Sequence, residues 1–470
     1  STPIKSSAAS DVYKRQTLFC CFLFAGCSDD NEETIIPIVE FQQNEITNIP
    51  YLGQTYEIVM TTEAEWTAKS LVDWCTMLAT KGNGNRTLVF NIEANLGESR
   101  QGEIVVYSQE EQFTIKLQQQ KNEIDGEFRY RIPVVFHVIY NDEFDVSQNP
   151  SAEVLYGMLN EVNSLYSHAS NNSMDLNMEF VLAEYDPQGN KLKEAGIDRI
   201  YWPQEKLDPT TVMEDKTGQY THFIWEPNEY INILIYPFSI SSILGISTFP
   251  YNPAEDSEHW LAGLESVSIG TTLENLNYVH GISLNSLYLK DVEDVFVKYV
   301  KDPAMKVLMN KQSELYITLA HELGHYLGLR HTFSEVSGGW LADTDFCSDT
   351  GSYIRSGTNG YEAQLNKLLE KIQTDPSFAE SYDWESLFWR DGDANFGRYQ
   401  AHNIMDYSYC YLDEFTQQQR DRVRFVLEYS PLIPGPKKTQ PIGTRSVRGI
   451  KDLPVTLSDG YPLGLSRSQK

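Results

Sequence analysis

The stretch HELGHYLGLRH, residues 321–331, places three of the chain's nine histidines within eleven positions. It ends a longer segment, NKQSELYITLAHELGHYLGL, in which apolar residues recur at helical spacing from Leu315 to Tyr326. This spacing predicts an amphipathic helix whose apolar stripe packs against a sheet. Gly328 follows, and a residue without a Cβ can take a left-handed conformation that ends the helix and turns the chain back.

The three histidines are predicted to be metal ligands. His321 and His325 lie four residues apart, so their imidazoles project from one helix face within reach of a single Zn²⁺. After the turn at Gly328, His331 approaches the same metal. Three histidines leave a fourth position open to water, which is typical of a catalytic zinc site. Glu322 directly follows the first ligand and is predicted to act as the general base that takes a proton from that water.

Other interpretations of this stretch stay open. A helix with three unrelated histidines is one, but five fixed residues in eleven positions arise by chance with a probability of about 10⁻⁵. A zinc hydrolase that acts on substrates other than peptides is another. A binding protein with an inactive catalytic domain is a third, although the complete set of three histidines and Glu322 speaks against it.

The length and charge of the chain limit its organisation and its partners. With 470 residues the chain is expected to form two or three domains. A formal net charge of -29 and a pI near 4.6 argue against nucleic acid or an anionic membrane surface as partners. The composition, 41% hydrophobic and 12% aromatic, is typical of a globular protein.

The first 37 residues are predicted to lie outside the folded domains. Residues 1–16 end in DVYKRQ, which resembles the translation of a sequencing adaptor, so they are interpreted as an assembly scar and excluded from the fold. Residues 17–27 resemble a truncated lipoprotein signal, with small residues before Cys27, and residues 28–37 resemble a polar tether. The resemblance implies that Cys27 is acylated and anchors an exported protein at the bacterial outer membrane or cell surface. The alternative is a buried apolar strand with a chance cysteine.

Residues 38–121 alternate between apolar and polar side chains in several short runs separated by turns, which predicts a small antiparallel β-sandwich. Trp66, Trp74, Asn95 and Arg100 carry a resemblance to the BACON domain, an immunoglobulin-like module of exported Bacteroidetes proteins. The resemblance implies contact with glycans or mucin, and an equally open interpretation is a spacer that holds the next domain off the membrane.

Residues 126–436 are predicted to form an α/β catalytic domain. Strand-like runs at 129–140, 178–185, 230–238 and 280–289 accompany a helical pattern at 151–167.

The segment HNIMDYSYC, residues 402–410, together with the histidine motif, resembles the metzincins and, within them, the pappalysin family of zinc metalloproteases. The resemblance implies a zinc endopeptidase that acts on proteins or peptides, with Met405 as a packing residue beneath the metal. It also implies that Tyr407 stabilises the oxyanion; the alternative is a tyrosine that only fills the core.

Four further expectations concern the rest of the chain. The acidic residues Asp343, Asp345 and Asp349 are candidates for holding Ca²⁺, although an acidic loop is usually only solvated. Export and their positions after the motif predict a disulfide between Cys347 and Cys410. Cys75 lies in no recognisable latency motif, so the mode of latency stays undecided. The tail at 437–470 is expected to be poorly ordered or a processed extension.

Overall fold

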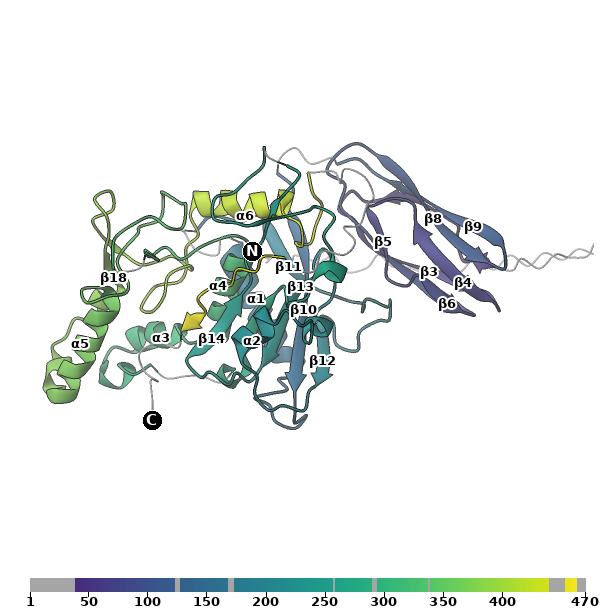
Figure 1. Cartoon of the computed structure of the whole chain (residues 1–470). Coiled ribbons are helices and arrows are strands. Elements are labelled where there is room, and N and C mark those ends of the chain that lie inside the picture. The colour runs from purple at the N-terminus through teal and green to yellow at the C-terminus, as the bar shows by residue number, and fades with distance from the viewer. Residues whose placement is uncertain are drawn as a thin grey trace, which may run out of the picture.

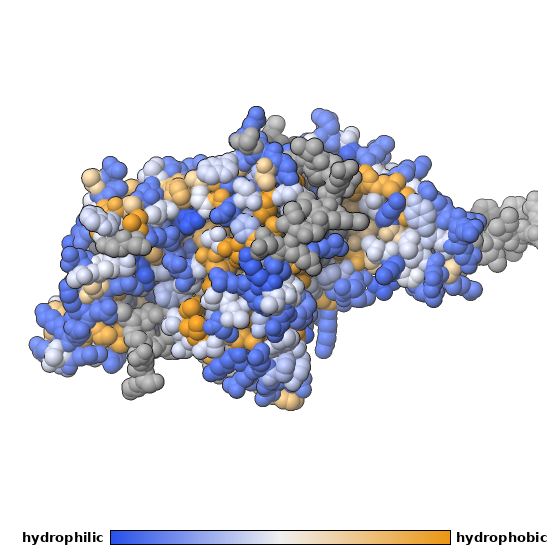
Figure 2. Space-filling model, in the orientation of Figure 1, coloured by the Kyte–Doolittle hydropathy of each residue, from blue (hydrophilic) through white to orange (hydrophobic). Residues whose placement is uncertain are grey.

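The computed structural model of the chain describes residues 39–122, 127–167, 173–256, 258–289, 294–336, 339–438 and 453–462 (Figure 1). The predicted scar, signal and tether, with Cys27, therefore lie outside the described residues. Within the described ranges, none of the helices combines the length and apolar character needed to cross a bilayer. On the face shown in Figure 2 hydrophilic side chains predominate, with smaller apolar areas between them.

The N-terminal domain is a sandwich of two sheets. One sheet has the strand order β1-β3-β7-β5 and the other β2-β9-β8-β4-β6. The strands are β1 (Glu40–Phe41), β2 (Glu45–Ile49), β3 (Gln54–Thr61), β4 (Glu65–Ser70), β5 (Cys75–Met77), β6 (Lys81–Asn83), β7 (Arg86–Ile92), β8 (Arg100–Ser108) and β9 (Glu111–Gln119). All pairs are antiparallel except β2 and β9, which pair in parallel, so the all-antiparallel prediction is wrong for this one pair. The alternating apolar side chains meet between the sheets around buried Trp66.

Three of the residues that carry the BACON resemblance, Trp74, Asn95 and Arg100, hold one end of this sandwich together. The Arg100 guanidinium donates hydrogen bonds to Gln119 Oε1 (2.7 Å) and to the carbonyl of Glu93 (3.0 Å). Its Cζ lies 4.5 Å from the centre of the Trp74 ring. The Asn95 amide donates to two backbone carbonyls. Arg100 and Asn95 thus donate hydrogen bonds to backbone carbonyls where strands end, so both residues have a structural role in this domain.

The sandwich packs directly on the second domain (Figure 1). Leu78 and Val89 of the sandwich form a buried cluster with Tyr185 of the second domain. Beside it, the Thr76 hydroxyl donates to Glu229 Oε1 at 3.0 Å. The contact includes both apolar and polar groups, so the sandwich is attached to the second domain by more than the connecting chain.

The second domain is built on a twisted, mixed sheet of seven strands. The order is β11-β10-β13-β17-β14-β20, with β12 beside β10. The strands are β10 (Tyr130–Tyr140), β11 (Met178–Leu182), β12 (Ile197–Tyr201), β13 (Ile231–Tyr236), β14 (Ile243–Ser247), β17 (Ile282–Asn285) and β20 (Tyr461–Pro462). The pairs from β11 to β17 are parallel, whereas β14 runs antiparallel to both β17 and β20. This sheet and its helices confirm the predicted fold class, a β-sandwich followed by an α/β domain with an active-site helix.

Helices and short strand pairs complete the domain. They are α1 (Ala152–Tyr166), α2 (Pro209–Glu214), α3 (Pro303–Lys311), α4 (Leu315–Tyr326), α5 (Tyr361–Thr374), α6 (Gln417–Tyr429), β15 (Asn252–Pro253) with β16 (Ser266–Val267), and β18 (Trp389–Asp391) with β19 (Arg398–Gln400). Helix α4 packs against β14, β17 and α1. Every residue of α4 except Tyr316 is buried. The buried surface of the helix is therefore wider than the single apolar stripe that the sequence predicted. A helix that is covered on all sides buries its polar face as well, and that face carries the histidines.

Candidate active site

Helix α4 and the turn after it bring the three histidines together. His321, Glu322 and His325 lie on α4, which ends at Tyr326. Gly328 has a φ of 90°, the left-handed conformation expected from the sequence. Two backbone hydrogen bonds fix this turn. The Leu327 N–H donates to the carbonyl of Leu323, and the Leu329 N–H donates to the carbonyl of Gly324. The chain then reverses and returns His331 to the same face.

Each imidazole is oriented through its Nδ1. His321 Nδ1 lies 2.8 Å from the carbonyl oxygen of Ile404, and His325 Nδ1 lies 2.8 Å from that of Leu329. A carbonyl oxygen can only accept, so both Nδ1 atoms carry the proton and both Nε2 atoms are bare.

His331 Nδ1 lies 2.5 Å from Glu335 Oε1. The carboxylate orients this ring in the way that outer carboxylates orient metal-bound histidines.

The three Nε2 atoms converge in a way that fits a metal ion. The ligand atoms of the three histidines all lie within 4.8 Å of one another, and the Nε2 atoms of His325 and His331 are 3.1 Å apart. With no proton between them, two lone pairs at this distance repel. Among the described residues, His321 Nε2 has no hydrogen-bond partner. Burial lowers the pKa of all three imidazoles well below 6.5, so they are neutral. Three neutral nitrogen donors that converge in this way suit Zn²⁺.

Glu322 is buried beside this cluster. Its Oε2 accepts a hydrogen bond from the Ser458 hydroxyl (3.0 Å), and its Oε1 accepts one from the Tyr461 N–H (3.2 Å). Burial raises the pKa of its carboxyl to about 8. Strand β14 makes room for it at Gly245, where a Cβ would lie 2.9 Å from Glu322 Cγ. The raised pKa brings this carboxyl group close to neutral pH, where it can accept and return a proton.

The segment around Met405 packs against α4. A Cβ at Gly324, in the middle of α4, would collide with the sulfur of Met405, so the helix glycine permits this close packing. The Tyr407 ring centre lies 4.5 Å from that of His331 and 5.2 Å from that of His321. The Tyr407 hydroxyl donates to the carbonyl of Gly460 at 3.2 Å. It is therefore positioned to donate to a carbonyl oxygen in the cleft.

The predicted disulfide between Cys347 and Cys410 is wrong. Both residues are buried free thiols. The Cys410 thiol donates to the carbonyl of Asn403 (3.3 Å), while Cys347 lies in a turn in which its N–H donates to Asp345 Oδ1 (3.0 Å). Burial raises the pKa of both thiols. Their positions in the sequence did not impose the short Cα separation that a disulfide needs.

The acidic loop residues act as hydrogen-bond acceptors for their surroundings. Asp345 accepts from the Thr350 hydroxyl (2.7 Å), and Asp349 accepts from the Thr416 hydroxyl (2.8 Å) at the start of α6. Neither of the two clusters of three ligand-type residues found in the described parts of the chain includes Asp343, Asp345 or Asp349. Binding of Ca²⁺ by this loop stays a prediction.

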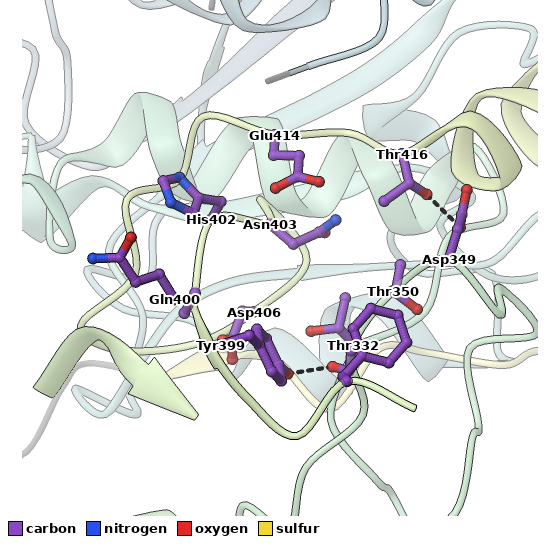
Figure 3. A pocket seen from close by; sticks show the side chains of 13 residues that line it. Thr332, Asp349, Thr350, Tyr399, Gln400, His402, Asn403, Asp406, Glu414 and Thr416 are labelled. Carbon is purple, nitrogen blue, oxygen red and sulfur yellow. Dashed lines mark hydrogen bonds between the residues drawn. The ribbon is translucent and has the colours of Figure 1, made fainter. Parts of the chain in front are cut away.

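A cavity of about 180 Å³ is lined by Asp349, Asp406, Glu414 and His402, among others (Figure 3). None of the three clustered histidines lines it. Asp406 is already paired with the buried Arg390 guanidinium at 3.1 Å. The cavity is therefore separate from the histidine site, and two of its carboxylates already have partners within the protein.

The sequence did not reveal Glu335 or any residue of the tail as part of the site. The expectation of a poorly ordered tail is wrong for residues 453–462, which lie against Glu322 and Tyr407. No motif marks these residues. The available signals were two short apolar stretches in the tail, LPVTL at 453–457 and YPLGL at 461–465.

Comparison with protein-family models supports the assignment of both domains. Residues 298–428 match the peptidase family described as "Pregnancy-associated plasma protein-A", and residues 64–120 match the BACON family, described as "Putative binding domain, N-terminal". Both resemblances are confirmed. The segment that holds the three histidines is thus similar to metallopeptidases of the pappalysin family, whose members depend on a metal ion.

Solved structures give further similarities. Mature mirolysin of Tannerella forsythia, in complex with a cleaved peptide, is 19% identical over 64% of this chain and 92% of that one, with a TM-score of 0.38. A promirolysin mutant of the same organism is 19% identical over 64% and 81%, with a TM-score of 0.40. A protein of Bacteroides thetaiotaomicron solved by NMR is 12% identical over 21% and 100%, with a TM-score of 0.16. No curated protein matched the chain.

Proposed function

We propose that the chain is a zinc-dependent endopeptidase of the metzincin type that hydrolyses peptide bonds of extracellular proteins. The observation that supports this most is the convergence of three bare Nε2 atoms beside a buried carboxylate and a tyrosine hydroxyl. The similarity of residues 298–428 to a peptidase family agrees with it.

In this proposal His321, His325 and His331 hold the metal. The carbonyls of Ile404 and Leu329 orient the first two rings, and the carboxylate of Glu335 orients the third. When bound, Zn²⁺ supplies a Lewis acid that polarises the substrate carbonyl and acidifies a water molecule.

Glu322 and Tyr407 have separate roles, proton transfer and stabilisation of the oxyanion. Glu322 accepts a proton at its carboxylate and returns it to the nitrogen that leaves. Tyr407 donates from its hydroxyl to the oxygen on which negative charge develops. Burial raises the pKa of Tyr407 well above 10, which keeps this donor protonated. Met405 packs beneath α4 and takes no part in the chemistry.

A lipid anchor at Cys27 would place this activity at the bacterial outer membrane or cell surface. The apolar run before Cys27 and the acidic tether after it support this part of the proposal. The sandwich domain would then lie between the anchor and the catalytic domain, where it could contact glycans or mucin.

The function is tested with the purified full chain, zinc and a proteome-derived peptide library, with mass spectrometry of the products. We expect internal cleavage that a chelator abolishes, that zinc restores and that the Glu322→Gln variant lacks. A parallel panel of esters and non-peptide amides addresses the alternative hydrolase. Cleavage of that panel without any peptide product would contradict the proposal.

A further inference from the structure

Residues 453–462 lie along β14, at one edge of the seven-stranded sheet. Strand β20 pairs antiparallel with β14, with Tyr461 opposite Gly245, and Leu457 forms an antiparallel bridge with Thr248. The segment thereby adds a strand to β14, as Figure 1 shows in yellow. An edge strand with unpaired backbone groups is a site where an extended peptide binds by strand addition.

Backbone and side-chain hydrogen bonds hold the segment in this register. The Ser458 N–H donates to the carbonyl of Ser247 (2.8 Å), and the Phe249 N–H donates to the carbonyl of Thr456 (3.0 Å). The Ser247 N–H donates to the Ser458 hydroxyl oxygen (3.0 Å). Two of these three contacts join backbone groups, as in a peptide added to a strand, and the third uses the Ser458 side chain.

One peptide group of the segment meets both residues assigned to the chemistry. The carbonyl oxygen of Gly460 accepts from the Tyr407 hydroxyl at 3.2 Å, and the N–H of Tyr461 donates to Glu322 Oε1 at 3.2 Å. Hydrolysis of a peptide bond requires a donor at its oxygen and a proton for its nitrogen. The Gly460–Tyr461 peptide group is placed where both requirements would be met.

Side chains of the segment close the cleft around this group. The Tyr461 side chain is buried, and its ring centre lies 4.8 Å from that of His321. The carboxylate of Asp459 lies within 4.8 Å of ligand-type atoms of His331 and Glu335. A second peptide cannot pair with β14 or reach Glu322 while the segment is in this position.

We propose that residues 453–462 are an intramolecular inhibitory segment that binds along β14 as a peptide substrate does, with Gly460–Tyr461 at the position of the scissile bond. This inference rests on the proposed peptidase function.

Gly460 offers a selective way to release the segment. Its φ is 81°, and a Cβ at this position would lie 3.1 Å from Ile243 Cγ2. Valine is β-branched and strongly disfavours this conformation. Gly460→Val should therefore displace the segment. Gly397→Val is the matched control, because Gly397 has a φ of 60° and no atom within 4 Å of a Cβ.

The experiment combines three measurements on the full chain. Hydrogen exchange should speed up at the amides of Ser247 and Phe249 in Gly460→Val, while the amide of Thr248, which donates to Gly281 (3.0 Å), keeps its protection. A fluorescein-labelled peptide, LPVTLSDGYP, should bind the variant but neither the parent chain nor the control. Peptidase activity should rise at least about tenfold. A non-glycine residue in the left-handed region lowers the equilibrium constant for docking of the segment by roughly that factor.

The outcomes separate this inference from the proposed function. Faster exchange and peptide binding in a chain that cleaves no peptide would support docking of the segment along β14 but would reject the proposed peptidase function. Unchanged exchange, no peptide binding and unchanged activity in a folded Gly460→Val chain would overturn the inhibitory segment. Ser458→Pro is a second, independent variant for the case that Gly460→Val does not fold. It removes the hydrogen bond from the Ser458 N–H to Ser247 and the one from the Ser458 hydroxyl to Glu322, without crowding Ile243. It should give the same three results.

Discussion

Replacement of Glu335 by alanine removes the carboxylate that orients His331. The hydrogen bond measures 2.5 Å, and the Glu335 side chain is only 23% exposed, so water replaces it poorly. Loss of such an outer partner typically lowers metal affinity about 10–100-fold, or about 1.4–2.7 kcal/mol. Glu335→Ala should therefore bind zinc about 10–100-fold more weakly than the parent chain. Glu335→Gln keeps an acceptor but loses the charge, so its loss should be smaller.

Zinc affinity is measured by competition with a chromophoric chelator at fixed pH, a readout that does not depend on catalysis. The matched control is Asp256→Ala, since Asp256 Oδ2 makes the same kind of contact with His259 Nδ1 at 2.7 Å, outside the three-histidine cluster. Parent-like zinc affinity in Glu335→Ala, or an equal loss in Asp256→Ala, would refute the assigned role of Glu335.

Four further predictions follow from the site, the domain contact and the N-terminus. Measured in the Gly460→Val chain, Glu322→Gln should keep its zinc stoichiometry by atomic absorption while turnover falls about 10²–10⁴-fold, and loss of zinc would contradict the role of a base. In the same chain Tyr407→Phe should lower kcat about 10–10³-fold with little change in KM on a quenched peptide; a parent-like kcat would reject the oxyanion donor. Burial, and then the charge of Glu93, raise the pKa of Glu229 from 4.5 to about 7, so the folded state binds this proton more tightly than the unfolded state. The free energy of unfolding should therefore fall as the pH rises through this range, by at most about 3 kcal/mol, and Glu229→Gln should be more stable than the parent in urea at pH 8 but not at pH 4. With its complete signal the protein should partition into detergent phase and Cys27→Ser should not, so equal partitioning would reject acylation.

The sequence allowed the prediction of those parts of the site that depend on local spacing. His321 and His325 share a helix face because they are four residues apart, and Gly328 turns the chain because it lacks a Cβ. These relations hold in any fold that contains the helix. The place of Met405 was inferred by resemblance rather than by physics, because its contact with α4 spans about 80 residues of chain.

The remaining features depend on contacts that no local pattern encodes. Glu335 is one acidic residue among many, and only the path of the chain after His331 brings it to the imidazole. Residues 453–462 lack a helical or alternating pattern, and their order comes from pairing with β14, more than 200 residues earlier. The disulfide prediction failed for the same reason, because residues that follow one motif in sequence need not be neighbours in space.

One short segment, residues 404–407, contacts the three-histidine cluster, helix α4 and the inhibitory segment. The carbonyl of Ile404 orients His321, the sulfur of Met405 fills the space left by Gly324, and the hydroxyl of Tyr407 holds the carbonyl of Gly460. The orientation of His321, the packing of α4 and the hydrogen bond to a bound peptide group therefore depend on the same four-residue segment. Because the segment is buried and hydrogen bonded, it cannot shift at one of these contacts without moving the others. This shared support places the carbonyl of a bound peptide in a fixed relation to the three histidines, and that relation is what peptide hydrolysis at this site requires.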